Sequence, residues 1–146
     1  MDWELLFSTG GQIAMVGWLI LIFAPRRWPV LNVVPRLILP GVLSLGYTVL
    51  ILVYFARADG GFGSLAAVKA LMASDPVLLA GWVHYLAFDL FVGGWIAVRS
   101  DRLGISRVVQ APILIATFLF GPLGLLIHLI MAVPLGARTR PLTSEG

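Results

Sequence analysis

Residues 76–98 read PVLLAGWVHYLAFDLFVGGWIAV, an apolar stretch long enough to cross a lipid bilayer. A spanning helix needs about 20 mostly apolar residues, because the hydrocarbon layer is about 30 Å thick and a helix rises about 1.5 Å per residue. Asp75 and Pro76 are typical of a helix start, since Asp caps free N–H groups and Pro fits the first turn. We therefore predict a membrane-spanning helix over 76–98.

Three further stretches have the same length and character. The whole chain is 60% hydrophobic and 12% charged, whereas soluble domains are about 45–50% apolar and about 25% charged. The sequence predicts a single integral membrane domain over residues 1–146, folded as an all-α, four-helix transmembrane bundle. Its predicted spans are about 4–24, 36–56, 76–98 and 108–133.

The longest connection lies between the second and third predicted spans. Gly60 to Gly63 suit a turn, and Ser64 can cap a short helix over Leu65 to Ala73. The apolar residues and the single lysine of this segment suit a helix at the membrane interface. An ordinary loop helix is the alternative.

The distribution of basic residues predicts an orientation. Cytoplasmic connections of membrane proteins carry an excess of Lys and Arg. The first and third connections hold six basic residues, and the opposite side holds the other four: Arg26, Arg27, Arg36, Arg99, Arg102 and Arg107 against Arg57, Lys69, Arg138 and Arg140. We therefore predict that both termini lie outside.

Composition also excludes some classes of function. The net charge of +3 comes from residues in the connections, where positive-inside sorting and lipid head groups account for them, so nucleic acid is not a predicted partner. Because the chain has no cysteine, it has no disulfide framework, thiolate metal site or cysteine nucleophile.

Three ionisable side chains interrupt the apolar stretches: His84, Asp89 and His128. An ionisable group in hydrocarbon costs roughly 2.5–3.5 kcal/mol on insertion scales, so it usually faces a partner or a cavity and marks function. His84 and Asp89 lie five residues apart, which is about 140° of rotation and about 7.5 Å of rise on a helix. They therefore do not share one face, and a partner has to come from another span. The structural alternative is a buried carboxyl bonded to a neighbouring hydroxyl.

The fourth predicted span contains Phe120-Gly121-Pro122-Leu123-Gly124. Proline removes a helical hydrogen bond, so a kink is expected here. Gly121, Gly124 and His128 fall on nearly one face, which would let a neighbouring backbone approach and would point His128 into the bundle. A packing notch with a hydrogen-bonded histidine is the alternative. Gln12, in the first span, is predicted to make a helix-packing hydrogen bond.

Two motifs resemble a known family. The run from His84 to Gly93 with Trp95-Ile96, and the run Phe118 to Gly124 followed by His128, resemble the abscisic-acid-deficient-four-like family, which is also called neoxanthin-synthase-like. The resemblance extends over nearly the whole chain and implies a four-helix membrane protein. Plant members of that family are chloroplast membrane proteins required for neoxanthin formation. The acidic, apolar N-terminus is unlike a plastid transit peptide, which predicts a bacterial inner-membrane protein.

The resemblance implies an isomerase or lyase that acts on a carotenoid or related isoprenoid. In the plant reaction an epoxy end group becomes an allene: a proton is lost beside the polyene as the epoxide C–O bond opens. This chemistry needs a base and an acid. His84, Asp89 and His128 match the family motif and are the predicted catalytic residues. Isomerisation is expected to need no cofactor.

Other functions fit the same residues. One is a non-catalytic carotenoid-binding protein or membrane-complex scaffold. Another is a protein that binds b-type haem through two histidines on neighbouring spans, or that holds a metal between His84, Asp89 and His128. An ion or proton carrier has only one mid-membrane carboxylate to support it. The expected partners are a lipid-soluble substrate, membrane lipids and a second copy of the chain.

Overall fold

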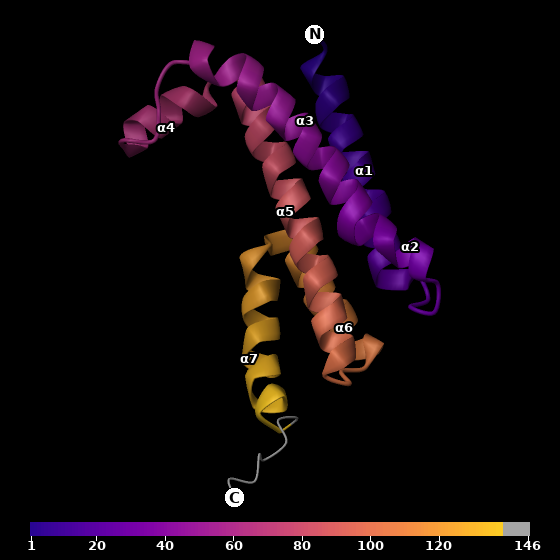
Figure 1. The fold of residues 1–146 in the computed structure, drawn as a ribbon. Coiled ribbons are helices and arrows are strands. Elements are labelled where there is room, and N and C mark those ends of the chain that lie inside the picture. The colour runs from indigo at the N-terminus through magenta and orange to yellow at the C-terminus, as the bar shows by residue number, and fades with distance from the viewer. Residues whose placement is uncertain (139–146) are drawn as a thin grey trace, which may run out of the picture. The chain divides into compact units, whose positions relative to one another are not determined.

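The computed structural model describes residues 1–138, with side chains as far as Pro134. All the regular secondary structure within residues 1–138 is helical, which confirms the all-α prediction (Figure 1). In chain order the elements are α1 (Trp3–Phe23), α2 (Pro29–Val33), the π-helix η1 (Val34–Ile38), α3 (Leu39–Tyr54), the 3-10 helix η2 (Phe55–Arg57), α4 (Leu65–Met72), α5 (Asp75–Arg102), α6 (Arg107–Phe120) and α7 (Pro122–Arg138).

Within residues 1–138, three helical segments are long and apolar enough to cross a membrane. They are α1, the continuous run Pro29–Arg57 that joins α2 to η2, and α5. They correspond to the first three predicted spans. The third is longer than predicted, since α5 continues from the apolar stretch through Arg99 to Arg102. Basic side chains in the last turn of a helix complement the helix dipole.

The second segment begins earlier than predicted because a π-turn carries the helix past two prolines. Pro35 and Pro40 each lack a backbone N–H, so each interrupts the regular bonding pattern. Between them the Leu39 N–H bonds to the Val34 carbonyl, five residues back, which is the bonding of a π-helix. The helix therefore starts at Pro29 rather than at Arg36.

The prediction of one continuous helix over 108–133 is wrong, because the chain forms two shorter helices there. Gly121 ends α6 with φ +49° and ψ −96°, a conformation that residues with a side chain rarely adopt. Pro122 starts α7, where its missing N–H costs little. A glycine that can turn, followed by a proline that can start a helix, breaks the segment instead of kinking it. The predicted four-helix bundle is thus three candidate spans followed by two shorter apolar helices.

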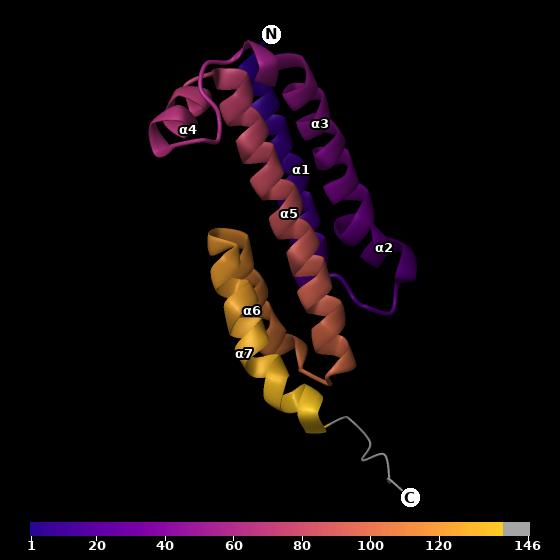
Figure 2. The same cartoon turned by 60° about the vertical axis from the view of Figure 1, so that its left-hand side comes forward.

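The chain divides into two compact units, residues 1–91 and the residues from Val92 onward, with the boundary inside α5. In the first unit α1, α3 and the first part of α5 lie side by side (Figures 1 and 2). Their core is made of small and branched residues, with Ala14 of α1, Leu43 of α3 and Ala80 of α5 all buried. Small residues suit spanning helices because they let the backbones approach.

In the second unit α6 and α7 form an antiparallel hairpin (Figure 2). Gly124 lies directly against Thr117, and a Cβ atom at Gly124 would lie 2.6 Å from the Thr117 Cα. Gly124 thus permits a close backbone approach, but the backbone is that of Thr117, within the same predicted span. Gln110 holds the turn before α6, since its amide donates to the Asp101 carboxylate at 2.8 Å and to the Ile105 carbonyl at 2.8 Å.

The predicted short helix between the second and third spans is present as α4. Ser64 caps it as expected, because the Ser64 hydroxyl accepts a hydrogen bond from the Ala67 N–H at 3.1 Å. Leu71 is buried, whereas Leu65 and the preceding Phe62 are largely exposed. That amphipathic arrangement suits the interface position that the sequence predicts, which stays a prediction.

Candidate functional site

His84 lies on the surface of the first unit, between two aromatic rings. Its ring centroid is 5.4 Å from that of Tyr47 in α3 and 4.6 Å from that of Phe88, one turn further along α5. The side chain is exposed. In a spanning helix an exposed histidine faces lipid or a lipid-filled groove, where a lipid-soluble molecule can reach it.

Asp89 lies on a neighbouring face of α5. Tyr85, one turn earlier, donates a hydrogen bond to its carboxylate. The second carboxylate oxygen, Oδ2, is buried and has no hydrogen-bond partner among the described residues. Buried polar atoms are nearly always bonded, so this atom needs an explanation, and a catalytic role is one of the accepted explanations.

His84 and Asp89 are brought near each other without sharing a face. His84 lies within electrostatic range of the Asp89 carboxylate. The two residues have different aromatic neighbours. His84 contacts the tilted rings of Tyr47 and Phe88, whereas Asp89 follows Tyr85, whose ring stacks on that of Trp82 at 5.5 Å between centroids. This arrangement agrees with the 140° separation expected for residues five apart.

A groove of about 320 Å³ lies between α5 and the second spanning segment. Phe88 both lines this groove and contacts the His84 ring. Most of the other lining residues are apolar, and Arg36 and Ser44 supply the polar atoms. The groove would hold a largely apolar molecule whose oxygen-bearing end reaches a cation and a hydroxyl.

His128 is fully buried in the second unit. Its Nδ1 atom is 3.3 Å from the Ser100 hydroxyl, and its ring lies in a T-shaped arrangement with that of Trp95, with 5.5 Å between the ring centroids. Its Nε2 atom is buried without a hydrogen-bond partner in the part of the chain that the structure describes. His128 thus points into its unit, as predicted. Its Nδ1 atom lies at hydrogen-bond distance from Ser100, and its Nε2 atom has no hydrogen-bond partner among the described residues.

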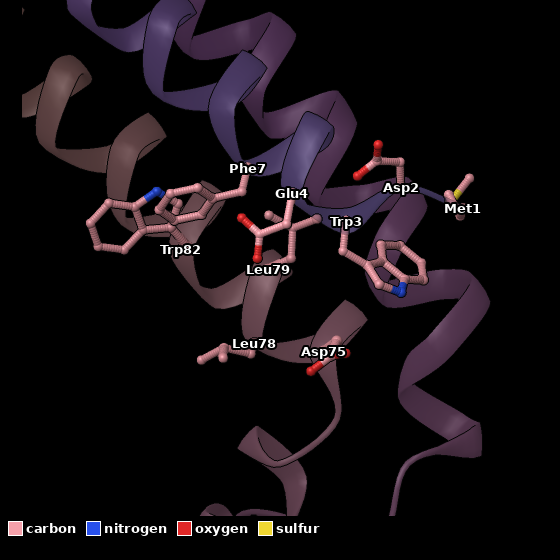
Figure 3. Close-up of a pocket in the computed structure, with 9 residues that line it drawn as sticks. All are labelled: Met1, Asp2, Trp3, Glu4, Phe7, Asp75, Leu78, Leu79 and Trp82. Carbon is pink, nitrogen blue, oxygen red and sulfur yellow. The ribbon is translucent and has the colours of Figure 1, made fainter.

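Two other cavities in the first unit contain none of the three predicted residues. One, of about 520 Å³, lies where α1 and α5 begin and is lined by Asp2, Glu4 and Asp75 together with aromatic rings (Figure 3). Carboxylates at helix starts complement the helix dipole, which explains them without a ligand. The other, of about 410 Å³, is an apolar groove between α1 and α3 that passes Gly10 and Gly46.

Among the described residues, no three His, Cys, Asp or Glu side chains are grouped so that they could hold a metal ion. A single metal held between His84, Asp89 and His128 therefore receives no support. Haem binding requires only two histidines and stays a prediction.

Sequence reasoning missed Ser100 because it follows Arg99 at the expected end of the span and carries no charge. The continuation of α5 to Arg102 is what brings Ser100 to His128. Sequence reasoning also misplaced Gln12, which is exposed on α1 instead of bonded within the bundle. Asn32, by contrast, is buried and closes the first connection through the Arg26 and Trp28 carbonyls.

The fold and these residues define an all-helical protein with three candidate membrane spans and ionisable side chains within its apolar helices. Comparison with known families matches residues 5–128 to the ABA4-like family, described as ABA DEFICIENT 4-like. The chain therefore belongs to the ABA4-like family, and the matched range includes His84, Asp89 and His128. No curated protein and no solved structure matches the chain.

Proposed function

We propose that the protein is a membrane isomerase or lyase that acts by acid–base chemistry on a carotenoid or a related isoprenoid. The observation that carries the proposal is the pair on α5: a buried Asp89 oxygen without a hydrogen-bond partner among the described residues, within electrostatic range of an exposed histidine. The ring neighbour of that histidine, Phe88, lines a largely apolar groove. Family membership supports the substrate class.

The proposed reaction opens an epoxide into an allene and an alcohol. Asp89 Oδ2 takes the proton from the end carbon of the polyene, which adjoins the epoxide, and the electron pair of that C–H bond forms the second C=C bond of the allene. The epoxide C–O bond breaks, and its oxygen receives a proton from His84. One proton leaves and one arrives, so the reaction is an isomerisation with no redox change and needs no cofactor. Tyr85 holds the other carboxylate oxygen and so fixes Asp89.

The role proposed for His128 is to hold or pass a proton inside the second unit. Ser100 fixes the imidazole through Nδ1, which leaves Nε2 to act on a group that enters the unit. A hydrogen bond to one ring nitrogen selects the tautomer and therefore decides whether the other nitrogen donates or accepts.

A non-catalytic carotenoid-binding or scaffold protein is the second candidate. The groove between α1 and α3 favours it, because that groove is almost wholly apolar and contains no ionisable side chain. Such a groove can bind a polyene and cannot transform it.

We also propose a multi-pass bacterial inner-membrane protein with its N-terminus outside. Because α6 and α7 form a hairpin, the chain returns after α7 to the side on which α5 ends. This topology is an alternative to the predicted one, in which both termini lie outside. In that alternative the end of α7, at Arg138, lies on the same side as the six arginines of the first and third connections, and Arg57 and Lys69 lie opposite. The excess of positive charge on the proposed cytoplasmic side becomes larger than in the four-span topology.

Expression in bacteria engineered to accumulate different carotenoids, with chromatography of the pigments, tests the proposal. The expected result is a new pigment of unchanged mass from an epoxy-carotenoid. Binding of unchanged pigment to the purified protein would instead favour the scaffold. A Soret band in the purified protein would favour haem, and no change in any pigment would count against an isomerase of carotenoids.

A further inference from the structure

The exposed face of α1 carries an amide in an otherwise apolar setting. Gln12 is exposed, and it lies nine residues after the first residue of the helix, Trp3. At about 1.5 Å per residue this is about 14 Å along a layer that is about 30 Å thick, so the amide lies near mid-membrane. Lipid head groups are out of its reach at that depth, and lipid tails offer no hydrogen bonds.

The side chains around Gln12 form a continuous stripe on the helix. The residues at helical spacing on either side of it are all exposed: Leu5, Ser8, Met15, Val16 and Leu19. The opposite face holds the buried residues of α1: Gly10, Ala14, Gly17, Trp18 and Leu21. The stripe is therefore the face of α1 that points away from the core of its own unit.

We propose that this stripe, centred on Gln12, is the contact through which two copies of the chain pair in the membrane. An amide has both a donor and an acceptor, so it is complementary to the same amide on a second copy. Membrane insertion gives every copy the same orientation, and a twofold axis along the membrane normal then puts Gln12 opposite Gln12 at the same depth. The small Ser8 side chain one turn earlier lets the two helices approach.

The absence of cysteine from the chain allows a direct test by disulfide cross-linking in native membranes. Ser8→Cys adds one thiol within the stripe and changes the side chain little. Leu45→Cys is the matched control: Leu45 is 66% exposed on α3 and lines the same groove as Thr9 and Gly10, so its depth is similar. Under mild oxidation Ser8→Cys should give a dimer, and Leu45→Cys should give little.

A second substitution in the Ser8→Cys chain tests the amide itself. Gln12→Leu should lower the cross-linked fraction roughly threefold or more, whereas Gln12→Asn should keep most of it, because interhelical polar bonds of this kind have modest strength. The side chain is exposed, so neither change disturbs the core. Equal cross-linking of Ser8→Cys and Leu45→Cys, no effect of Gln12→Leu, or an adduct with a different protein would overturn the proposal.

Discussion

Asp89 and His128 are alike in having one polar atom held and one left without a partner. Tyr85 bonds one oxygen of Asp89, and Ser100 lies at hydrogen-bond distance from one nitrogen of His128. The remaining atoms, Oδ2 and Nε2, are buried and unbonded within the described residues. This arrangement is compatible with the proton-transfer roles proposed for both side chains, and the hydroxyl neighbours fix them without adding a second charge to the apolar surroundings.

Asp89→Asn should lower product formation at least about 100-fold, because the amide keeps the shape of the side chain and cannot take the proton. The protein should still accumulate in the membrane. Pigment analysis measures the first effect and quantitative immunoblotting the second. Asp59→Asn, in the connection after the second span, is the control and should leave product unchanged. Normal product from the Asp89→Asn variant would exclude Asp89 as the base.

Ser100→Ala should lower the free energy of unfolding by about 1–3 kcal/mol, since it leaves a buried nitrogen of His128 without its partner. Thermal or denaturant unfolding in detergent measures this loss. Ser44→Ala is a suitable control, because Ser44 is exposed on α3 and the change should stay within about 0.5 kcal/mol. Equal stability of the two variants would show that the contact between Ser100 and His128 contributes nothing.

At the scale of elements, the two interruptions of helical structure have different causes. Around Pro35 and Pro40 the helix continues by changing its bonding to a π-turn. At Gly121 it stops, because the backbone reverses and the next residue, Pro122, starts a new helix. The difference lies in the neighbour of each proline: only Pro122 follows a glycine that adopts a positive φ.

Gly124→Ala should destabilise the hairpin of α6 and α7 by about 1–3 kcal/mol, because the new methyl group meets the backbone of Thr117 and forces the helices apart. Gly46→Ala is its matched control, since a Cβ atom at Gly46 meets nothing within 4 Å and alanine favours the helix. Unfolding midpoints of both variants in detergent test this pair. A control that loses as much stability as Gly124→Ala would count against the hairpin.

At the scale of the whole molecule, the hairpin of α6 and α7 is the basis of the proposed topology, in which the chain returns to the side on which α5 ends. A fourth span would separate the start of α6 from the end of α7 by the full thickness of the membrane. In the proposed hairpin topology the start of α6, at Arg107, and the end of α7, at Arg138, would lie on one side. The charge pattern is explained more simply by the hairpin, since membrane proteins concentrate Lys and Arg on one side.

Single cysteines in the cysteine-free chain test this topology. Ser106→Cys, before α6, and a cysteine added after Gly146 should react with an impermeant thiol reagent from the same side of the membrane. Gly63→Cys, in the connection before α4, should react from the opposite side. If the added cysteine reacted from the same side of the membrane as Gly63→Cys, the result would support four full spans instead.

The sequence by itself determined the helical class, the first three spans, the cap at Ser64 and the angular separation of His84 and Asp89. These depend on local properties, namely apolar length, capping chemistry and the 100° step of the helix. Only the tertiary structure decided the break at Gly121, the exposure of Gln12 and the pairing of Ser100 with His128. A glycine next to a proline allows either a kink or a turn, and the packing of Gly124 on Thr117 favours the turn. Residues distant in sequence decide whether a polar side chain has a partner or is exposed. The spacing of residues along one helix does not specify which distant residues lie beside it.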